Sequence, residues 1–175
     1  MRLHSNAAIA PLLNSGILGA ALLSRGVSCF CMAQVQRSVV TLRIGSDDLI
    51  PGEITRLLGT PPTHTQIKGE KIVGRKTGHG RIAEVGMWRL CAKDREPEDM
   101  DGQIEEILSQ TTSDLAIWRS VGEKHQIDLF CGLFLGVSNE GMSLSSKSLA
   151  ALGERGIELA LDIYSGDDDD EPSTE

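Results

Sequence analysis

Alternating hydrophobic and polar positions first appear at residues 39–44 (VVTLRI). This alternation, with its β-branched residues, predicts a strand. Residues 45–48 (GSDD) are typical of a turn, and residues 51–58 (PGEITRLL) then predict a short helix. Pro51 suits the first turn of that helix because its missing N–H needs no partner there. Gly59 is expected to end the helix, because glycine readily adopts the left-handed conformation that follows a helix.

The middle of the chain predicts one strand followed by two helices. Residues 82–91 include Trp88 and have the apolar content of a strand. Residues 104–111 have apolar positions at helical spacing, and Ser113 or Asp114 could cap a further helix that continues to Val121. We expect Trp88 and Trp118 to anchor the hydrophobic core.

The last third of the chain predicts strand, helix and strand. Residues 127–137 alternate, but both of their faces are largely apolar after Asp128, which is typical of a strand in the interior of a sheet. Residues 145–155 predict a helix with Leu149 and Leu152 facing inward. Residues 157–164 predict a strand with one dry face and one wet face.

This order of elements predicts an α+β fold. We expect a mainly antiparallel sheet of four or five strands, with the helices packed on one face. A faint repeat relates residues 39–59 to residues 131–153: each has a strand, a glycine turn, a helix and a Leu-Gly pair. The repeat predicts two similar halves, as in a variant of the ferredoxin-like fold.

Both ends of the chain differ from the body in composition. Residues 1–32 contain no acidic residue and have an apolar stretch that is short for a membrane span, so we expect a leader outside the fold. Three interpretations remain open: a signal peptide, a transit peptide, or an upstream extension of a chain that starts at Met32. The single domain is expected at residues 33–165, with a disordered acidic tail at residues 166–175.

Charge and composition exclude several classes of protein. The net charge is −8 and the pI is about 5.0, which excludes a globally basic DNA-binding protein. Six of the 25 acidic residues lie in residues 167–175, so the rest of the chain has 19 acids against 17 bases. Aromatic residues make up only 3% of the chain, which argues against nucleic-acid binding by base stacking. The cysteines form no C-x-x-C pair, and a reduced, cytoplasmic location fits them best.

The one local anomaly is a basic, glycine-rich segment at residues 64–89. It could form a cradle for an anion such as phosphate. The candidate anion-binding residues are Lys68, Arg75, Lys76, His79, Arg81 and Trp88. The alternative interpretation is a solvated, mobile loop. Residues 69–77 resemble a phosphate-binding loop, but no apolar strand precedes them and no helix follows, so a true loop of that kind is not expected.

The sequence contains no G-x-S-x-G or H-E-x-x-H pattern, and its histidines lack the paired spacing of metal ligands. We therefore expect no cofactor, no metal site and no catalytic residues, and no integral membrane association. The leading hypothesis is a non-catalytic interaction module, of an immunity or regulatory type, whose acidity suits a basic protein partner. The alternative is a binder of small anions, or an enzyme acting on them, that uses the basic segment.

Several short stretches resemble a known family. They include Ser46-Asp47-Asp48-Leu49, residues 51–59, Gly86-Met87-Trp88-Arg89-Leu90 and residues 156–164. In this order they resemble the mostly bacterial family named domain of unknown function 4279, over about residues 37–165. The resemblance implies a short, soluble, single-domain protein and carries no established activity or catalytic residue. One departure is Ile50, where the family often has a polar residue, so a cap at the start of the first helix is expected to be missing.

Overall fold

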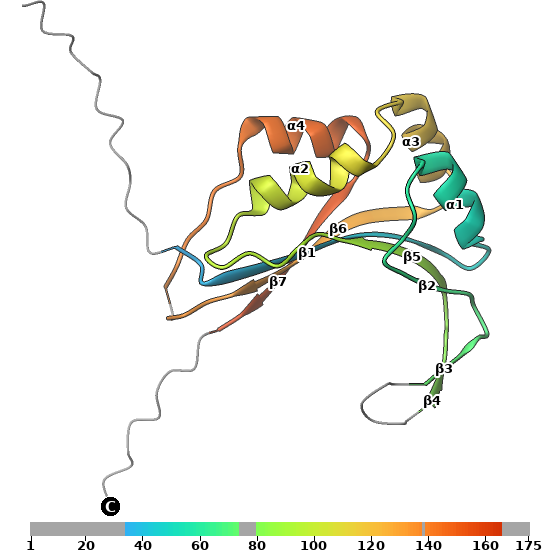
Figure 1. Cartoon of the computed structure of the whole chain (residues 1–175), viewed down its shortest axis with the longest axis horizontal. Coiled ribbons are helices and arrows are strands. Elements are labelled where there is room, and N and C mark those ends of the chain that lie inside the picture. Colours follow the sequence, from blue (N-terminus) through green and yellow to red (C-terminus); the bar gives the residue numbers. More distant parts are fainter. Residues whose placement is uncertain (1–33, 74–79, 138, 166–175) are drawn as a thin grey trace, which may run out of the picture. The chain divides into compact units, whose positions relative to one another are not determined.

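The computed structural model describes residues 34–73, 80–137 and 139–165. These ranges form an α+β fold with a five-stranded mixed sheet, a separate two-stranded sheet and four helices (Figure 1). In chain order, the elements are β1 (Arg37–Ser46), α1 (Pro51–Leu58), β2 (His64–Gln66), β3 (Lys71–Val73), β4 (Gly80–Ile82), β5 (Gly86–Cys91), α2 (Met100–Gln110), α3 (Leu115–Gly122), β6 (Gln126–Phe134), α4 (Ser146–Glu154) and β7 (Glu158–Tyr164).

The strand order in the larger sheet is β2-β5-β1-β6-β7. The pairs β2–β5, β5–β1 and β1–β6 are antiparallel, whereas β6 and β7 are parallel. The sheet is therefore mixed, and not purely antiparallel. The parallel pair follows from its connection, because α4 crosses over the sheet and returns the chain to the same end, as parallel strands require.

The expected two similar halves are not confirmed. In the first half, β1 and β5 pair with each other in antiparallel directions, while β6 and β7 in the second half are parallel. A structural repeat would need the same relationship in both halves. The sequence echo between residues 39–59 and 131–153 reflects a common order of strand and helix and not a common topology.

All four described helices cover one face of the sheet (Figure 1). The core between them is formed by alternate residues of β1, β5 and β6, and the predicted anchors Trp88 and Trp118 are both fully buried in it. The Trp88 indole N–H donates to Thr55 Oγ1 of α1 over 3.1 Å, and that of Trp118 donates to the Thr112 carbonyl over 2.9 Å. Each indole thus has a polar partner, as buried tryptophans require.

Two predictions about inward-facing apolar residues are corrected by the structure. Leu152 of α4 is buried as expected, but Leu149 is 52% exposed and faces outward. On β7, the side expected to be dry carries Leu161 and Ile163, which are half exposed because β7 is an edge strand that α4 covers only in part. The missing cap at Ile50 is confirmed, since no side chain there bonds to the start of α1.

The basic segment contains more regular structure than the loop interpretation expected. It forms β2, which pairs with β5, and the strands β3 and β4, which pair with each other. Figure 1 shows β3 and β4 on the side of the sheet away from the helices. Residues 74–79 between these two strands lie outside the described residues, as do the expected leader and the acidic tail.

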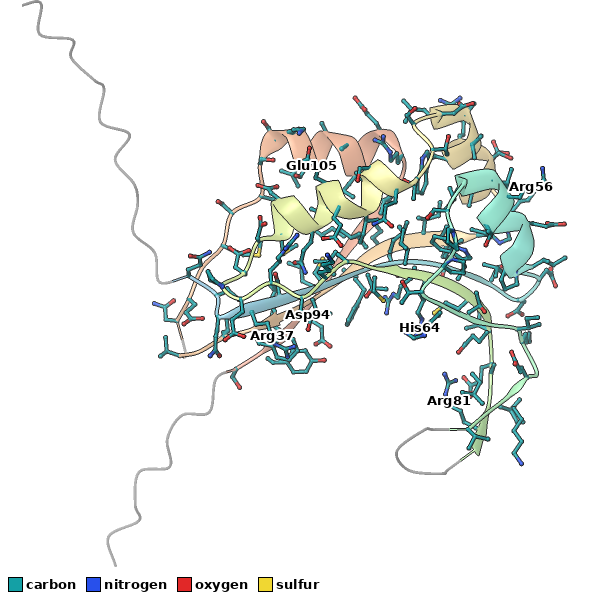
Figure 2. The ribbon with its side chains drawn as sticks, viewed as in Figure 1. Arg37, Arg56, His64, Arg81, Asp94 and Glu105 are labelled. Carbon is teal, nitrogen blue, oxygen red and sulfur yellow. The ribbon has the colours of Figure 1, made fainter. Side chains whose placement is uncertain are left out.

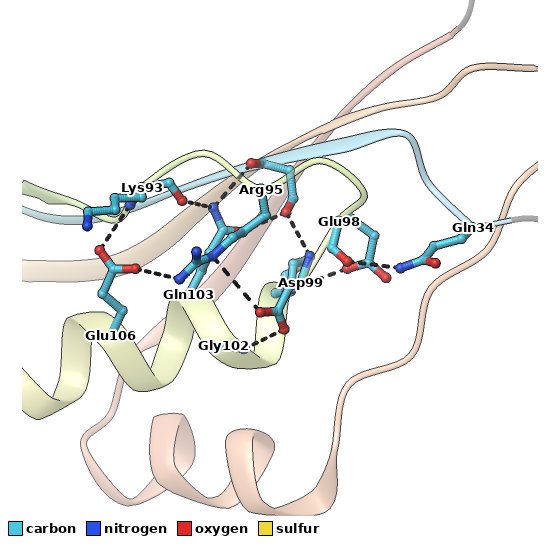
Figure 3. Close-up of polar contacts among 10 residues, drawn as sticks. Gln34, Lys93, Arg95, Glu98, Asp99, Gly102, Gln103 and Glu106 are labelled. Atoms are coloured by element: carbon cyan, nitrogen blue, oxygen red, sulfur yellow. Dashed lines mark hydrogen bonds and ion pairs between the residues drawn. The ribbon is translucent and has the colours of Figure 1, made fainter.

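A buried polar cluster joins α2 to the sheet (Figure 3). Gln103 of α2 is fully buried, and its Oε1 accepts a 2.6 Å hydrogen bond from Ser38 Oγ. Gln103 Nε2 donates to the carbonyls of Ser38 and Lys93. Because buried polar groups need partners, this glutamine specifies where α2 sits on β1.

No helix in the described part of the chain is long and apolar enough to cross a membrane.

Candidate binding face

The face of the five-stranded sheet opposite the helices is the strongest candidate for a functional surface, and we call it the open face. Strand alternation places every second residue of each strand there, so its composition follows from the strand registers. Its main side chains are Arg37, Val39, Thr41 and Arg43 of β1; His64 and Gln66 of β2; Met87, Arg89 and Cys91 of β5; Gln126, Asp128, Phe130 and Phe134 of β6; and Glu158, Ala160, Asp162 and Tyr164 of β7.

Three residues form a continuous stack across one end of the open face. Arg37, Phe134 and Tyr164 lie opposite one another on β1, β6 and β7. The Arg37 guanidinium carbon lies 3.8 Å from the centre of the Phe134 ring, and the Phe134 and Tyr164 rings are parallel within 6° with their centres 4.7 Å apart. Because β1 and β7 flank β6 on opposite sides, Arg37 and Tyr164 contact opposite faces of Phe134.

The stack leans over Gly132, the residue between Phe130 and Phe134 on this face. A Cβ at Gly132 would lie 3.5 Å from Phe134 Cε2 and 3.8 Å from Tyr164 Cε2. The two rings therefore cover the backbone where a larger side chain would otherwise stand. This explains why Gly132 is buried on a face without helices.

A second row of side chains crosses all five strands and is polarised in charge. The registers place His64, Arg89, Arg43, Asp128 and Glu158 side by side. Arg43 Nε and Nη2 donate to both carboxylate oxygens of Asp128, over 2.7 and 2.9 Å, and the guanidinium carbon lies 4.3 Å from the centre of the Phe130 ring. The row is basic at the β2 edge and acidic at the β7 edge.

A hollow of about 640 Å³ lies at the end of the open face where β1 ends. Arg43 and Asp128 form part of its wall, together with Met87, Lys124 and His125. The volume is in the range of small-ligand pockets. Basic and acidic groups both line it, so its charge does not select one sign of ligand.

His125 forms a polar pair beside this hollow. Its Nδ1 lies 2.7 Å from Ser46 Oγ. Burial lowers the pKa of His125, and the nearby Lys124 charge adds to this effect, while Glu53 and Asp48 oppose it. The imidazole is therefore neutral at pH 7 and can accept a hydrogen bond from the hydroxyl. No carboxylate is recorded as a hydrogen-bond partner of His125 among the described residues.

The structure does not gather the predicted anion-binding residues around one cavity. Lys68 Nζ forms a 2.6 Å ion pair with Asp47, and Arg81 Nη2 donates to Gln66 Oε1 over 2.9 Å. Trp88 lies in the core on the helix side of the sheet. The other three candidates, Arg75, Lys76 and His79, lie outside the described residues.

Figure 2 shows which labelled side chains lie on each side of the sheet. Those on the side away from the helices are Arg37, His64, Arg81 and Asp94, whereas Arg56 and Glu105 lie on helices.

Sequence reasoning missed the open-face arginines Arg37 and Arg43 and their aromatic partners. The alternating pattern of the strands could have shown that these residues face away from the core. It could not show which residues are neighbours across the sheet, because that depends on strand order.

No group of three or more side chains suited to holding a metal ion occurs in the ranges that the structure describes. The arrangement on the open face is instead one of planar cations, aromatic rings and carboxylates in contact. Such groups bind other molecules through stacking and charge-assisted hydrogen bonds.

Comparison with known proteins gives one result. Neither the curated proteins nor the solved structures include a match to the chain. A family model described as domain of unknown function 4279 matches residues 34–166, which spans both sheets and all four described helices. This agrees with the resemblance found in the sequence, and the chain belongs to the family of domain of unknown function 4279.

Proposed function

We propose that the protein is a non-catalytic interaction module, of an immunity or regulatory type, which binds a protein partner on its open face. The observation that carries the proposal is the pair of arginine–aromatic contacts on that face, Arg37 with Phe134 and Arg43 with Phe130. Arginine and aromatic residues are enriched in protein interfaces, where they account for much of the binding energy.

The surface is also preorganised. The Arg43 side chain is held by Asp128 and Phe130, and Arg37 is held by Phe134 and by a 3.1 Å ion pair with Asp94. Side chains that are already ordered lose less conformational entropy when a partner binds. A face built in this way supports binding without rearrangement of the sheet.

The charges of the open face indicate the chemistry of the partner. Arg37 and Arg43 are paired with acids, whereas Glu158 and Asp162 at the β7 edge form no ion pair with another described residue. The chain as a whole has a net charge of −8. A partner with basic side chains over β7 would complement these acids, and opposite charges would speed the encounter.

Site-specific photo-crosslinking in the source cell tests the proposal. A photoreactive phenylalanine analogue replaces His64 or Glu158, the exposed ends of the charged row on the open face. The matched controls carry it at Arg56 of α1 or Glu105 of α2, which are exposed on the helix side. We expect both open-face positions to capture the same protein and the helix positions to miss it.

The proposal also requires that capture depends on the side chains of the face. Changing Arg89→Glu reverses one charge in the row without removing a recorded ion pair among the described residues, and should weaken capture at both open-face positions. Equal capture from the helix positions, or no captured protein at any of the four positions, would contradict the proposal.

A second candidate function is the binding of a small anion by the basic segment, and one observation supports it. Three basic side chains of that segment, His64, Arg81 and Arg89, are directed to the open-face side of the sheet. A thermal-shift titration with inorganic phosphate and nucleotides at low salt tests this alternative. Stabilisation that disappears in Arg81→Gln and Arg89→Gln, but persists in the control Arg56→Gln, would favour it over the interaction module.

A further inference from the structure

We infer that Tyr164 and Asp162 form the binding site for an arginine side chain of the protein partner. This inference rests on the proposed interaction function and specifies one contact with the partner, at the acidic β7 edge of the open face. The site would hold a guanidinium stacked on the outer face of the Tyr164 ring and bonded to the Asp162 carboxylate.

The fold contains the same arrangement twice within its own chain. Arg43 lies over the Phe130 ring while both oxygens of Asp128 accept its hydrogen bonds. Arg37 lies over the Phe134 ring while Asp94 accepts from its Nη1 over 3.1 Å. In both cases one planar cation contacts a ring face and a carboxylate at the same time.

Tyr164 provides a third ring with a carboxylate beside it. Its hydroxyl donates a 2.7 Å hydrogen bond to Asp162 Oδ2, which keeps the acid next to the ring. One face of the ring is covered by Phe134. Tyr164 is on the edge strand and 45% exposed. No cationic side chain of the described residues lies over its ring.

Arginine fits this place better than lysine. A guanidinium is flat, so it can extend the existing stack of Arg37, Phe134 and Tyr164 by one parallel layer. It can bond to a carboxylate with two N–H groups while it stacks, whereas an ammonium makes a point contact.

Tyr164 is the only tyrosine in the chain, which makes the test direct. The full chain is labelled with ¹³C-tyrosine, and its ring signals are followed by NMR as the peptides Gly-Gly-Arg-Gly-Gly and Gly-Gly-Lys-Gly-Gly are added at low salt. We expect the arginine peptide to shift the ring signals at concentrations about two- to fivefold lower than the lysine peptide. Free arginine is titrated in parallel, and a response to it that exceeds the peptide response would identify a small-molecule site and overturn the protein-partner assignment.

Asp162→Asn should abolish the preference for arginine, while Glu105→Gln, which removes the same charge from the helix side, should leave it unchanged. Tyr164→Leu, followed through the backbone amide signals of β7, should abolish the arginine response. Equal responses to both peptides, or an arginine preference that survives Asp162→Asn, would overturn the inference. Capture at His64 and Glu158 in the crosslinking experiment would then still support the open face, so the two failures are distinguishable.

Discussion

His125 Nδ1 lies 2.7 Å from Ser46 Oγ and thereby joins the turn after α3 to the end of β1. The two residues are 79 positions apart in the chain. Both residues line the hollow at the end of the open face. The lowered pKa of His125 favours the neutral imidazole, whose Nδ1 can accept this hydrogen bond from the Ser46 hydroxyl.

This contact predicts a specific pH dependence of stability. The pKa of His125 is lower in the folded chain than its ordinary value of 6.5, so the unfolded chain binds more protons just below that pH. Stability should therefore fall as the pH drops below about 6.5. Urea unfolding between pH 5 and pH 8 should show a smaller fall for His125→Gln than for the unaltered chain. His64→Gln, an exposed histidine on β2, is the control, and an equal slope in both variants would contradict the prediction.

Gln103 should be among the most sensitive positions for stability. Gln103→Leu would leave the Ser38 hydroxyl without its acceptor and the Lys93 carbonyl without its donor. Both losses are in or beside the core, so we expect a cost of about 2–4 kcal/mol in the free energy of unfolding. Gln110→Leu on the exposed side of the same helix is the matched control and should change it by less than about 0.5 kcal/mol. Chemical denaturation of both variants checks this, and equal costs would refute it.

Two glycines near the end of α4 should respond to alanine with opposite signs. A Cβ at either Gly153 or Gly156 would meet no atom within 4 Å, so steric contact is the same for both. Gly153 is helical, and Gly153→Ala should stabilise the fold by about 0.5–1 kcal/mol. Gly156 has φ +65°, and Gly156→Ala should destabilise it by about 1 kcal/mol. Thermal unfolding of the two variants tests this prediction. If both substitutions changed the stability in the same direction, backbone conformation would not be what controls their effects.

The hydrogen bond from Tyr164 to Asp162 should be visible in the titration of the phenol. This bond raises the pKa of Tyr164, and the negative charge of Asp162 raises it further, because both favour the neutral phenol over the phenolate. Absorbance of the single tyrosine at alkaline pH should show a midpoint that moves down toward the ordinary value in Asp162→Ala. Glu158→Ala, which removes an acid from the same strand, should shift it less. A larger effect at Glu158 would mean that general charge, and not the hydrogen bond, controls this phenol.

Much of the secondary structure could be predicted from local patterns. The alternation in residues 39–44 predicts the strand that became β1, and residues 51–58 predict α1 with its boundaries unchanged. These signals are local because strand and helix periodicities place apolar residues on one side regardless of their partners. The strands β2, β3 and β4 have three residues each, which is too short for an alternating pattern to be recognised, and they were missed.

The candidate surface could not be predicted in the same way. Phe134 and Tyr164 are 30 residues apart in the sequence, and only the parallel pairing of β6 with β7 brings their rings together. Arg37 reaches the same stack because β1 pairs with the other side of β6. The sequence by itself determined the fold class, the family and which side chains alternate along each strand, because these depend on local periodicity and short motifs. The tertiary structure alone decided which residues are neighbours across the sheet and which face the helices leave open, because strand order and direction arise from contacts between distant segments.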